Sequence, residues 1–205
     1  MKHTRADIPW ATFLLIAISI LIYLLEALAG GSENPDVAIR FGAMYTPYIL
    51  MQGEWYRLVT AMFVHFGFEH LASNMLALMV EGPIVERYYG KIRFLAIYGF
   101  AGISGNLATM AWDILSGTAR LSAGASGGIF GLTAVFLIFA MLPELRRLFP
   151  IKRVLFSILI SLSPALEDGS INLIAHLGGL LGGFVIAGCF EYIKSRHYRK
   201  YYSSH

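Results

Sequence analysis

Apolar residues fill long stretches of this chain, and polar residues separate the stretches. A membrane-spanning helix needs about 20 mostly apolar residues, and six stretches approach or exceed that length: 9–30, 69–88, 92–113, 126–142, 151–165 and 171–193. The fifth is the shortest and has Pro164 at its end. A long polar and aromatic connection, residues 31–68, separates the first two. The pattern predicts an all-α polytopic membrane protein, a bundle of six transmembrane helices.

The composition supports this prediction. Of the 205 residues, 57% are hydrophobic and only 14% are charged, which is too few charges for the surface of an ordinary soluble domain. The first apolar stretch is too long for a signal-peptide core and lacks an obvious cleavage site. No linker, repeat or low-complexity tract divides the chain, so we predict one domain over residues 1–205.

The basic residues predict the orientation of the bundle. If both termini are cytoplasmic, most Lys and Arg residues flank the cytoplasmic ends of the helices, and only Arg40, Arg57 and Arg120 lie outside. The positive-inside rule favours this arrangement. The basic residues are scattered helix flanks and form no single basic face, which argues against nucleic acid as a partner.

Four polar residues then come together near the outer surface. The second, fourth and sixth helices run from outside to inside, and His70, Asn74, Ser126 and His176 lie within one or two turns of their outer ends. A single serine often bonds to its own helix, and a single His or Asn often links two helices. Four such residues at one depth, from three helices, instead favour a functional site.

The residue types predict acyl transfer. Ser126 begins a helix, where unpaired N–H groups and the helix dipole favour a developing oxyanion. His176 can accept the serine proton, and because no carboxylate lies at matching depth on the sixth helix, a Ser–His dyad is expected rather than a triad. His70 and Asn74 can donate hydrogen bonds to the oxyanion.

Glycines predict the helix crossing that this dyad needs. Gly179 and Gly183 follow His176 by three and seven residues, on roughly the same helical face. Gly127 and Gly131 form a matching pair on the fourth helix. Small residues let helix backbones approach closely, so we expect the fourth and sixth helices to cross at these glycines.

Other chemistry has little support. The only cysteine, Cys189, lies about 20 Å deeper than His176 and is interpreted as a core residue, so neither a thiol-rich metal site nor a disulfide is expected. Glu26 and Glu81 lie near opposite membrane faces and do not suggest a proton relay. Asn106 is interpreted as a helix–helix hydrogen bond. No cofactor or metal is predicted.

Five motifs resemble those of the rhomboid intramembrane serine proteases, in order and over nearly the whole chain. They are "EWYRLVTAMFVH" at 54–65, "HLASN" at 70–74, "EGPIVERYYGK" at 81–91, "GASG" at 124–127 and "AHLGGLLGG" at 175–183. The resemblance implies a rhomboid bundle whose long first loop is partly embedded in the membrane.

It also implies roles for individual residues. Ser126 would be the nucleophile and His176 the general base, with His70, Asn74 and the Ser126 backbone N–H at the oxyanion. The remaining motif residues would have structural roles: Trp55, Arg57 and His65 in the first loop, Glu86 at the cytoplasmic end of the second helix, and Gly124, Gly127, Gly179 and Gly183 around the dyad. Phe130 departs from the tyrosine of well-known bacterial members, which retains the ring stacking on the histidine and loses a hydroxyl.

The resemblance further implies transmembrane protein substrates, cut near the outer face, and the lipid bilayer as surroundings. A prokaryotic plasma membrane is the expected location, with the site facing the extracytoplasmic side. Two alternatives remain: a rhomboid-like pseudoprotease that binds membrane helices without cleavage, and a channel or transporter. Intact Ser126 and His176 argue against the first, and the confinement of the polar residues to one membrane face argues against the second.

Overall fold

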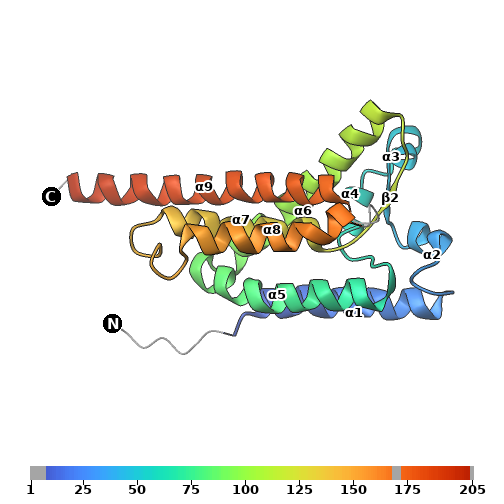
Figure 1. The fold of residues 1–205 in the computed structure, drawn as a ribbon, viewed down its shortest axis with the longest axis horizontal. Helices are drawn as coiled ribbons and strands as arrows, with labels where there is room; N and C mark the ends of the chain where they lie inside the picture. The colour runs from blue at the N-terminus through green and yellow to red at the C-terminus, as the bar shows by residue number, and fades with distance from the viewer. Residues whose placement is uncertain (1–7, 168–171, 204–205) are drawn as a thin grey trace.

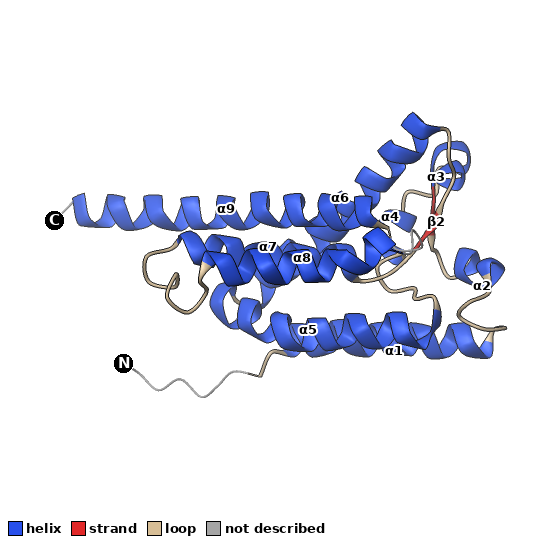
Figure 2. Cartoon of the chain, viewed as in Figure 1, coloured by secondary structure: helices blue, strands red, loops and turns tan. Residues whose placement is uncertain are grey.

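In a computed structural model, residues 8–167 and 172–203 are described, and they form a bundle of long helices with a smaller irregular layer at one end (Figures 1 and 2). The long helices are α1 (Trp10–Leu28), α5 (Gly67–Tyr89), α6 (Lys91–Ser116), α7 (Ser126–Met141), α8 (Ile151–Glu167) and α9 (Leu173–Ser203). The short elements are α2 (Pro35–Arg40), β1 (Met44–Tyr45), α3 (Thr46–Gln52), α4 (Arg57–Thr60) and β2 (Leu121–Ser122).

The six long helices correspond to the six apolar stretches of the sequence. By length and composition, α1, α6 and the Leu173–Arg196 part of α9 are able to cross a membrane. Helix α7 is apolar but has only 16 residues, α8 has 17, and α5 carries Glu69, Glu81, Glu86 and Arg87. The membrane-helix bundle is therefore confirmed, and the count of six spans stays a prediction.

Two helices extend beyond the apolar stretches that predicted them. Helix α8 continues past Pro164 to Glu167, although a proline at this position removes one backbone hydrogen bond. Helix α9 continues ten residues beyond position 193 to Ser203, because the Lys and Arg residues that follow its apolar part have high helix propensity.

The connections alternate between two ends of the bundle. The C-terminal ends of α5, α7 and α9 lie at one end, and α2, α3, α4 and β2 lie at the other (Figure 1). At the first end, Gly90 adopts a positive φ of 79° between α5 and α6, a backbone conformation that glycine reaches without steric cost. Ser126 and Leu173, the first residues of α7 and α9, therefore lie at the end that holds the first loop.

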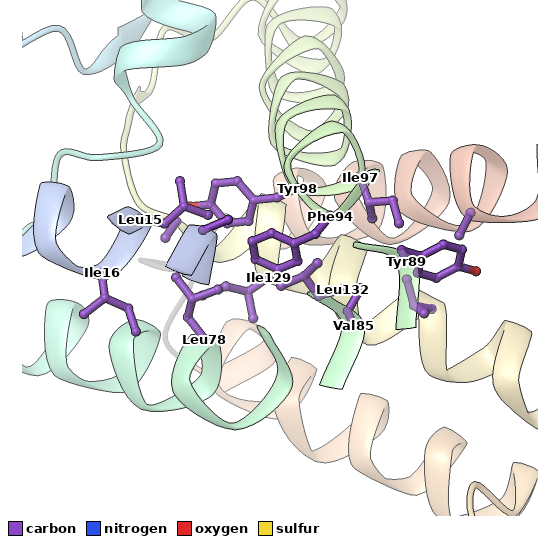
Figure 3. Close-up of a cluster of buried hydrophobic side chains, with 14 of the residues drawn as sticks. Leu15, Ile16, Leu78, Val85, Tyr89, Phe94, Ile97, Tyr98, Ile129 and Leu132 are labelled. Carbon is purple, nitrogen blue, oxygen red and sulfur yellow. The ribbon is translucent and has the colours of Figure 1, made fainter. Parts of the chain in front are cut away.

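An apolar cluster joins the helices in the middle of the bundle. It includes Leu15 and Ile16 of α1, and Figure 3 shows these side chains with others from α5, α6 and α7: Leu78, Val85, Tyr89, Phe94, Ile97, Tyr98, Ile129 and Leu132. In a bilayer such side chains stabilise the bundle through van der Waals packing between helices, because lipid tails are as apolar as the core. Cys189 lies outside this cluster: it is exposed on α9, in the same row of residues as Leu181 and Val185, and its interpretation as a core residue was wrong.

Helices α7 and α9 cross at their glycines, as the sequence predicts. A Cβ atom at Gly179 would overlap the carbonyl group of Gly127, and one at Gly183 would overlap Gly131. The crossing therefore leaves no room for a side chain at either point, and it brings the first turns of α7 and α9 together.

The first loop is a folded layer. Strands β1 and β2 pair antiparallel, with Met44 opposite Ser122, so the segment before α7 is fixed to the loop that precedes α5. Arg57 is buried and donates hydrogen bonds to the Ile39 and Ala43 carbonyls at 2.8 and 2.9 Å. Its Nε also pairs with Glu54 at 2.6 Å. These bonds hold α2, β1 and α4 together beside the start of α7.

Candidate active site

Ser126 and His176 form a direct side-chain pair between two helix starts. Ser126 is the first residue of α7, and His176 is the fourth residue of α9. The Ser126 Oγ atom lies 2.9 Å from Nε2 of His176, a hydrogen-bond distance. His176 is only 5% exposed. The close glycine crossing is what permits this distance.

Phe130 holds the imidazole ring from one side. It follows Ser126 by one helical turn, and its ring stacks on His176 with centroids 4.3 Å apart and planes 21° apart. The Nδ1 atom of His176 has no hydrogen-bond partner among the described residues. The Phe130 ring and the Ser126 hydroxyl both contact the imidazole ring.

His70 and Asn74 lie next to the turn that carries Ser126. Gly124 has a φ of 128°, and a Cβ atom there would lie 2.8 Å from Cε1 and Nε2 of His70 and 3.7 Å from Nδ2 of Asn74. Only glycine fits this backbone conformation and this contact. Asn74 also donates from Nδ2 to the His70 carbonyl at 3.0 Å. The structure thus brings all four predicted polar residues to one end of the bundle.

Three further hydrogen bonds fix the Ser126 turn. The Gly124 N–H donates to the Ala61 carbonyl at 2.8 Å, and the Ala125 N–H donates to Nε2 of His65 at 3.3 Å. Ser122 Oγ accepts a bond from Asn172 Nδ2 at 2.9 Å. The turn is therefore held by the first loop on one side and by the start of α9 on the other.

Asn172 is a site residue that the sequence interpretation missed. It directly precedes α9, and its Oδ1 accepts the Ala175 N–H at 3.0 Å, as an N-cap residue does. Its Nδ2 bonds both Thr109 Oγ1 of α6 and Ser122 Oγ of β2, at 2.8 and 2.9 Å. An asparagine immediately before an apolar helix was the sequence signal that could have identified it.

The residues predicted to have structural roles in the first loop differ in their exposure to solvent. Trp55 is 52% exposed, whereas Arg57 and His65 are buried in the first loop. Asn106 donates from α6 to the Leu58 carbonyl of α4 at 2.9 Å. Burial lowers the pKa of His65 to about 4, and the neighbouring His70 lowers it too.

Glu86 lies at the opposite end of the bundle and is buried. Its carboxylate accepts bonds from the backbone N–H groups of Ala11 and Thr12, and from Thr12 Oγ1, at 2.7–3.0 Å. It therefore caps the start of α1, whose own N-cap, Pro9, makes no side-chain bond. The first N–H groups of α1 have no intrahelical partners, and the Glu86 carboxylate lies within their reach.

No group of three or more His, Cys, Asp or Glu residues could hold a metal ion in the part of the chain that the structure describes. The fold and the site together define a polytopic membrane protein with a Ser–His pair, its histidine buried, at one end of a helix bundle. Comparison with known sequences identifies its family.

Residues 52–192 match the Rhomboid domain. Rhomboid protease GluP of Bacillus subtilis is 38% identical over 193 residues, which cover 94% of this chain and 37% of that protein. The putative rhomboid protease YdcA of the same organism is 33% identical over 93% of this chain and 92% of its own length. Rhomboid protease AarA of Providencia stuartii is 28% identical over 86% of this chain and 70% of its own. The chain belongs to the rhomboid family and is an integral membrane protein.

Proposed function

We propose that the protein is an intramembrane serine endopeptidase that uses Ser126 as nucleophile and His176 as general base. The observation that carries this proposal is the 2.9 Å distance between Ser126 Oγ and His176 Nε2. A nucleophile bonded to a base, with the base held by a third group, is the arrangement that nucleophilic catalysis requires. Here Phe130 is the third group. Two relatives whose names call them rhomboid proteases, GluP and AarA, support the same assignment.

The geometry supports the following reaction. His176 Nε2 accepts the Ser126 proton while Oγ bonds to the substrate carbonyl carbon. The resulting oxyanion forms at the start of α7, where the backbone N–H groups lack intrahelical partners. The imidazolium then gives its proton to the leaving amine, and the C–N bond breaks. Water, deprotonated by His176, hydrolyses the acyl-enzyme and restores the Ser126 hydroxyl.

His70 and Asn74 are the proposed side-chain donors to the oxyanion. Both lie against Gly124, two residues before the nucleophile. Removal of one such donor typically lowers kcat by about 10²–10³-fold. The Ser126 N–H would be the third donor.

The distribution of charge supports the proposed membrane orientation. The end with the α5–α6 and α7–α8 connections carries most of the described Lys and Arg residues: Arg87, Lys91, Arg93, Arg146, Arg147, Lys152, Arg153, Lys194 and Arg196. Arg40, Arg57 and Arg120 lie at the end with the dyad. With six spans and cytoplasmic termini, the positive-inside rule directs the site to the extracytoplasmic side. The proposed substrates are transmembrane proteins cut near that face, in a prokaryotic plasma membrane.

The test compares the native protein in detergent with Ser126→Ala and His176→Ala. The substrate is a single-span membrane protein with a small residue near the outer end of its helix, and a fluorophosphonate probe reports the nucleophile directly. Ser116→Ala is the matched control, since Ser116 is exposed at the end of α6 and its hydroxyl bonds the Trp112 carbonyl and the Thr118 hydroxyl.

We expect cleavage and labelling by the native protein and by Ser116→Ala, and neither by the two dyad variants. Cleavage that survives in folded Ser126→Ala protein would contradict the mechanism. A native protein that neither cleaves nor labels would instead indicate a pseudoprotease that binds helices without cutting them.

A further inference from the structure

Glu26 is a fully buried carboxylate near the end of α1, with 0% of its surface exposed. Its Oε2 accepts the backbone N–H of His65 at 3.3 Å, and its Oε1 has no hydrogen-bond partner among the described residues. An acidic residue inside a membrane helix is costly and usually has a function. The one hydrogen bond that Glu26 makes with its carboxyl group among the described residues is with the loop that precedes α5.

His65 connects that loop to the nucleophile. Its Nδ1 lies 3.1 Å from the Phe63 carbonyl, which makes Nδ1 the donor and leaves Nε2 as an acceptor. Nε2 accepts the Ala125 N–H at 3.3 Å. The ring is 0% exposed. The chain of contacts therefore runs from Glu26 through the His65 backbone and ring to the residue before Ser126.

The same ring supports His70. The His65 and His70 rings contact each other edge to face, with centroids 5.2 Å apart. His70 is a proposed oxyanion donor, and Ala125 precedes the nucleophile and its N–H group. One imidazole thus contacts both sides of the proposed oxyanion site.

We propose that Glu26 and His65 are positioning residues that set the orientation of the Ser126 turn and of His70 for catalysis. The proposal rests on the proposed proteolytic function. Glu26 fixes the His65 backbone, and the neutral His65 ring fixes the peptide plane between Gly124 and Ala125. Rotation of that plane would change the direction of the Ser126 N–H and the position of Oγ. Small misplacements of reacting groups can lower a rate by about 10²-fold.

The secondary structure around His65 explains why its backbone N–H needs Glu26 as a hydrogen-bond partner. Residues 61–66 lie between α4 and α5 and contain no helix of their own, so the His65 N–H has no helical partner. A buried N–H group without a hydrogen-bond partner destabilises the folded state. The carboxyl group of Glu26 supplies the partner and connects α1, which otherwise lies away from the dyad (Figure 1), to the site.

The experiment measures kcat, KM, the second-order rate of fluorophosphonate labelling at Ser126 and the Tm for Glu26→Leu, Glu26→Gln and His65→Phe. We expect Glu26→Leu and His65→Phe to lower kcat and the labelling rate about 10–100-fold with little change in KM. Glu26→Gln retains a carbonyl acceptor for the His65 N–H and should restore most of both rates. If Glu26→Leu does not fold, His65→Phe tests the other bond, because it keeps a ring and removes the Nε2 acceptor.

Thr12→Val is the matched control on the same helix. It removes the bond from Thr12 Oγ1 to Glu86 at the far end of α1. We expect a lower Tm and an unchanged labelling rate for the folded protein. A labelling rate unchanged in folded Glu26→Leu and His65→Phe, or lowered equally by Thr12→Val, would overturn the proposal while the proposed function stands. A native protein without cleavage or labelling would contradict both.

Discussion

Gly179 of α9 lies against the backbone carbonyl of Gly127 in α7, so closely that a Cβ atom at position 179 would overlap it. Gly127 directly follows Ser126, and Gly179 lies one turn beyond His176. The contact between these two glycines therefore sets the separation of Ser126 and His176, the proposed nucleophile and base.

Gly179→Ala is expected to move α9 away from α7 and to separate the dyad. Overpacking of this kind costs about 1–3 kcal/mol, and the 2.9 Å bond between Ser126 and His176 would lengthen. We expect a lower Tm and loss of most fluorophosphonate labelling. Gly188→Ala is the control on the same helix, because among the described residues a Cβ there would meet only Ile138 Cδ1, at the ordinary contact distance of 3.9 Å. Equal effects of the two changes would argue against the crossing as the cause.

Phe130→Leu should reduce activity through the position of His176. The substitution keeps apolar bulk at a buried site but removes the ring that stacks on the imidazole at 4.3 Å. Aromatic pairs contribute about 0.5–1.5 kcal/mol beyond burial, so we expect a kcat lower by about 2–10-fold with KM nearly unchanged. Phe130→Tyr preserves the stacking and should label at a rate close to native. A Leu variant with native kcat would show that the stacking does not position the base.

Asn172 performs two functions that can be separated by substitution. Asn172→Asp keeps the acceptor for the Ala175 N–H but cannot donate to Thr109 and Ser122. Asn172→Ala loses both functions and should also lose about 1 kcal/mol of helix-capping energy. We expect both variants to lower the labelling rate, and only Asn172→Ala to lose the cap contribution to the free energy of unfolding. Native labelling by Asn172→Asp would exclude a role for the two donated bonds.

Lowering the pH should reduce the free energy of unfolding, because His65 is protonated more readily in the unfolded chain than in the folded protein. The folded protein keeps His65 neutral down to its pKa of about 4, whereas an unfolded chain protonates the ring below about 6.5. Between these values the unfolded state binds more protons, so the free energy of unfolding falls as the pH falls, by up to about 3 kcal/mol. In unfolding experiments over this range, His65→Phe should lose that part of the slope. An unchanged slope would show that other groups cause the acid sensitivity.

Much of this protein follows from local sequence pattern. Long apolar stretches predicted the long helices, because a helix in a bilayer must satisfy its own backbone and expose apolar side chains. The dyad was predictable because Ser126 and His176 both begin helices that run in the same direction. The spacing of Gly127, Gly131, Gly179 and Gly183 predicted their crossing, since helical faces repeat every three to four residues.

Only the tertiary structure determined which hydrogen bonds position the residues of the site and of the helix ends. Glu26 bonds a residue 39 positions away and Glu86 caps a helix start 75 positions before it, and no periodicity relates such pairs. Asn172 joins three segments through one amide, and His65 contacts Ala125 across 60 residues. These partners were not predictable because a hydrogen bond depends on distance and direction between backbones, which are fixed only when the helices and the first loop pack together.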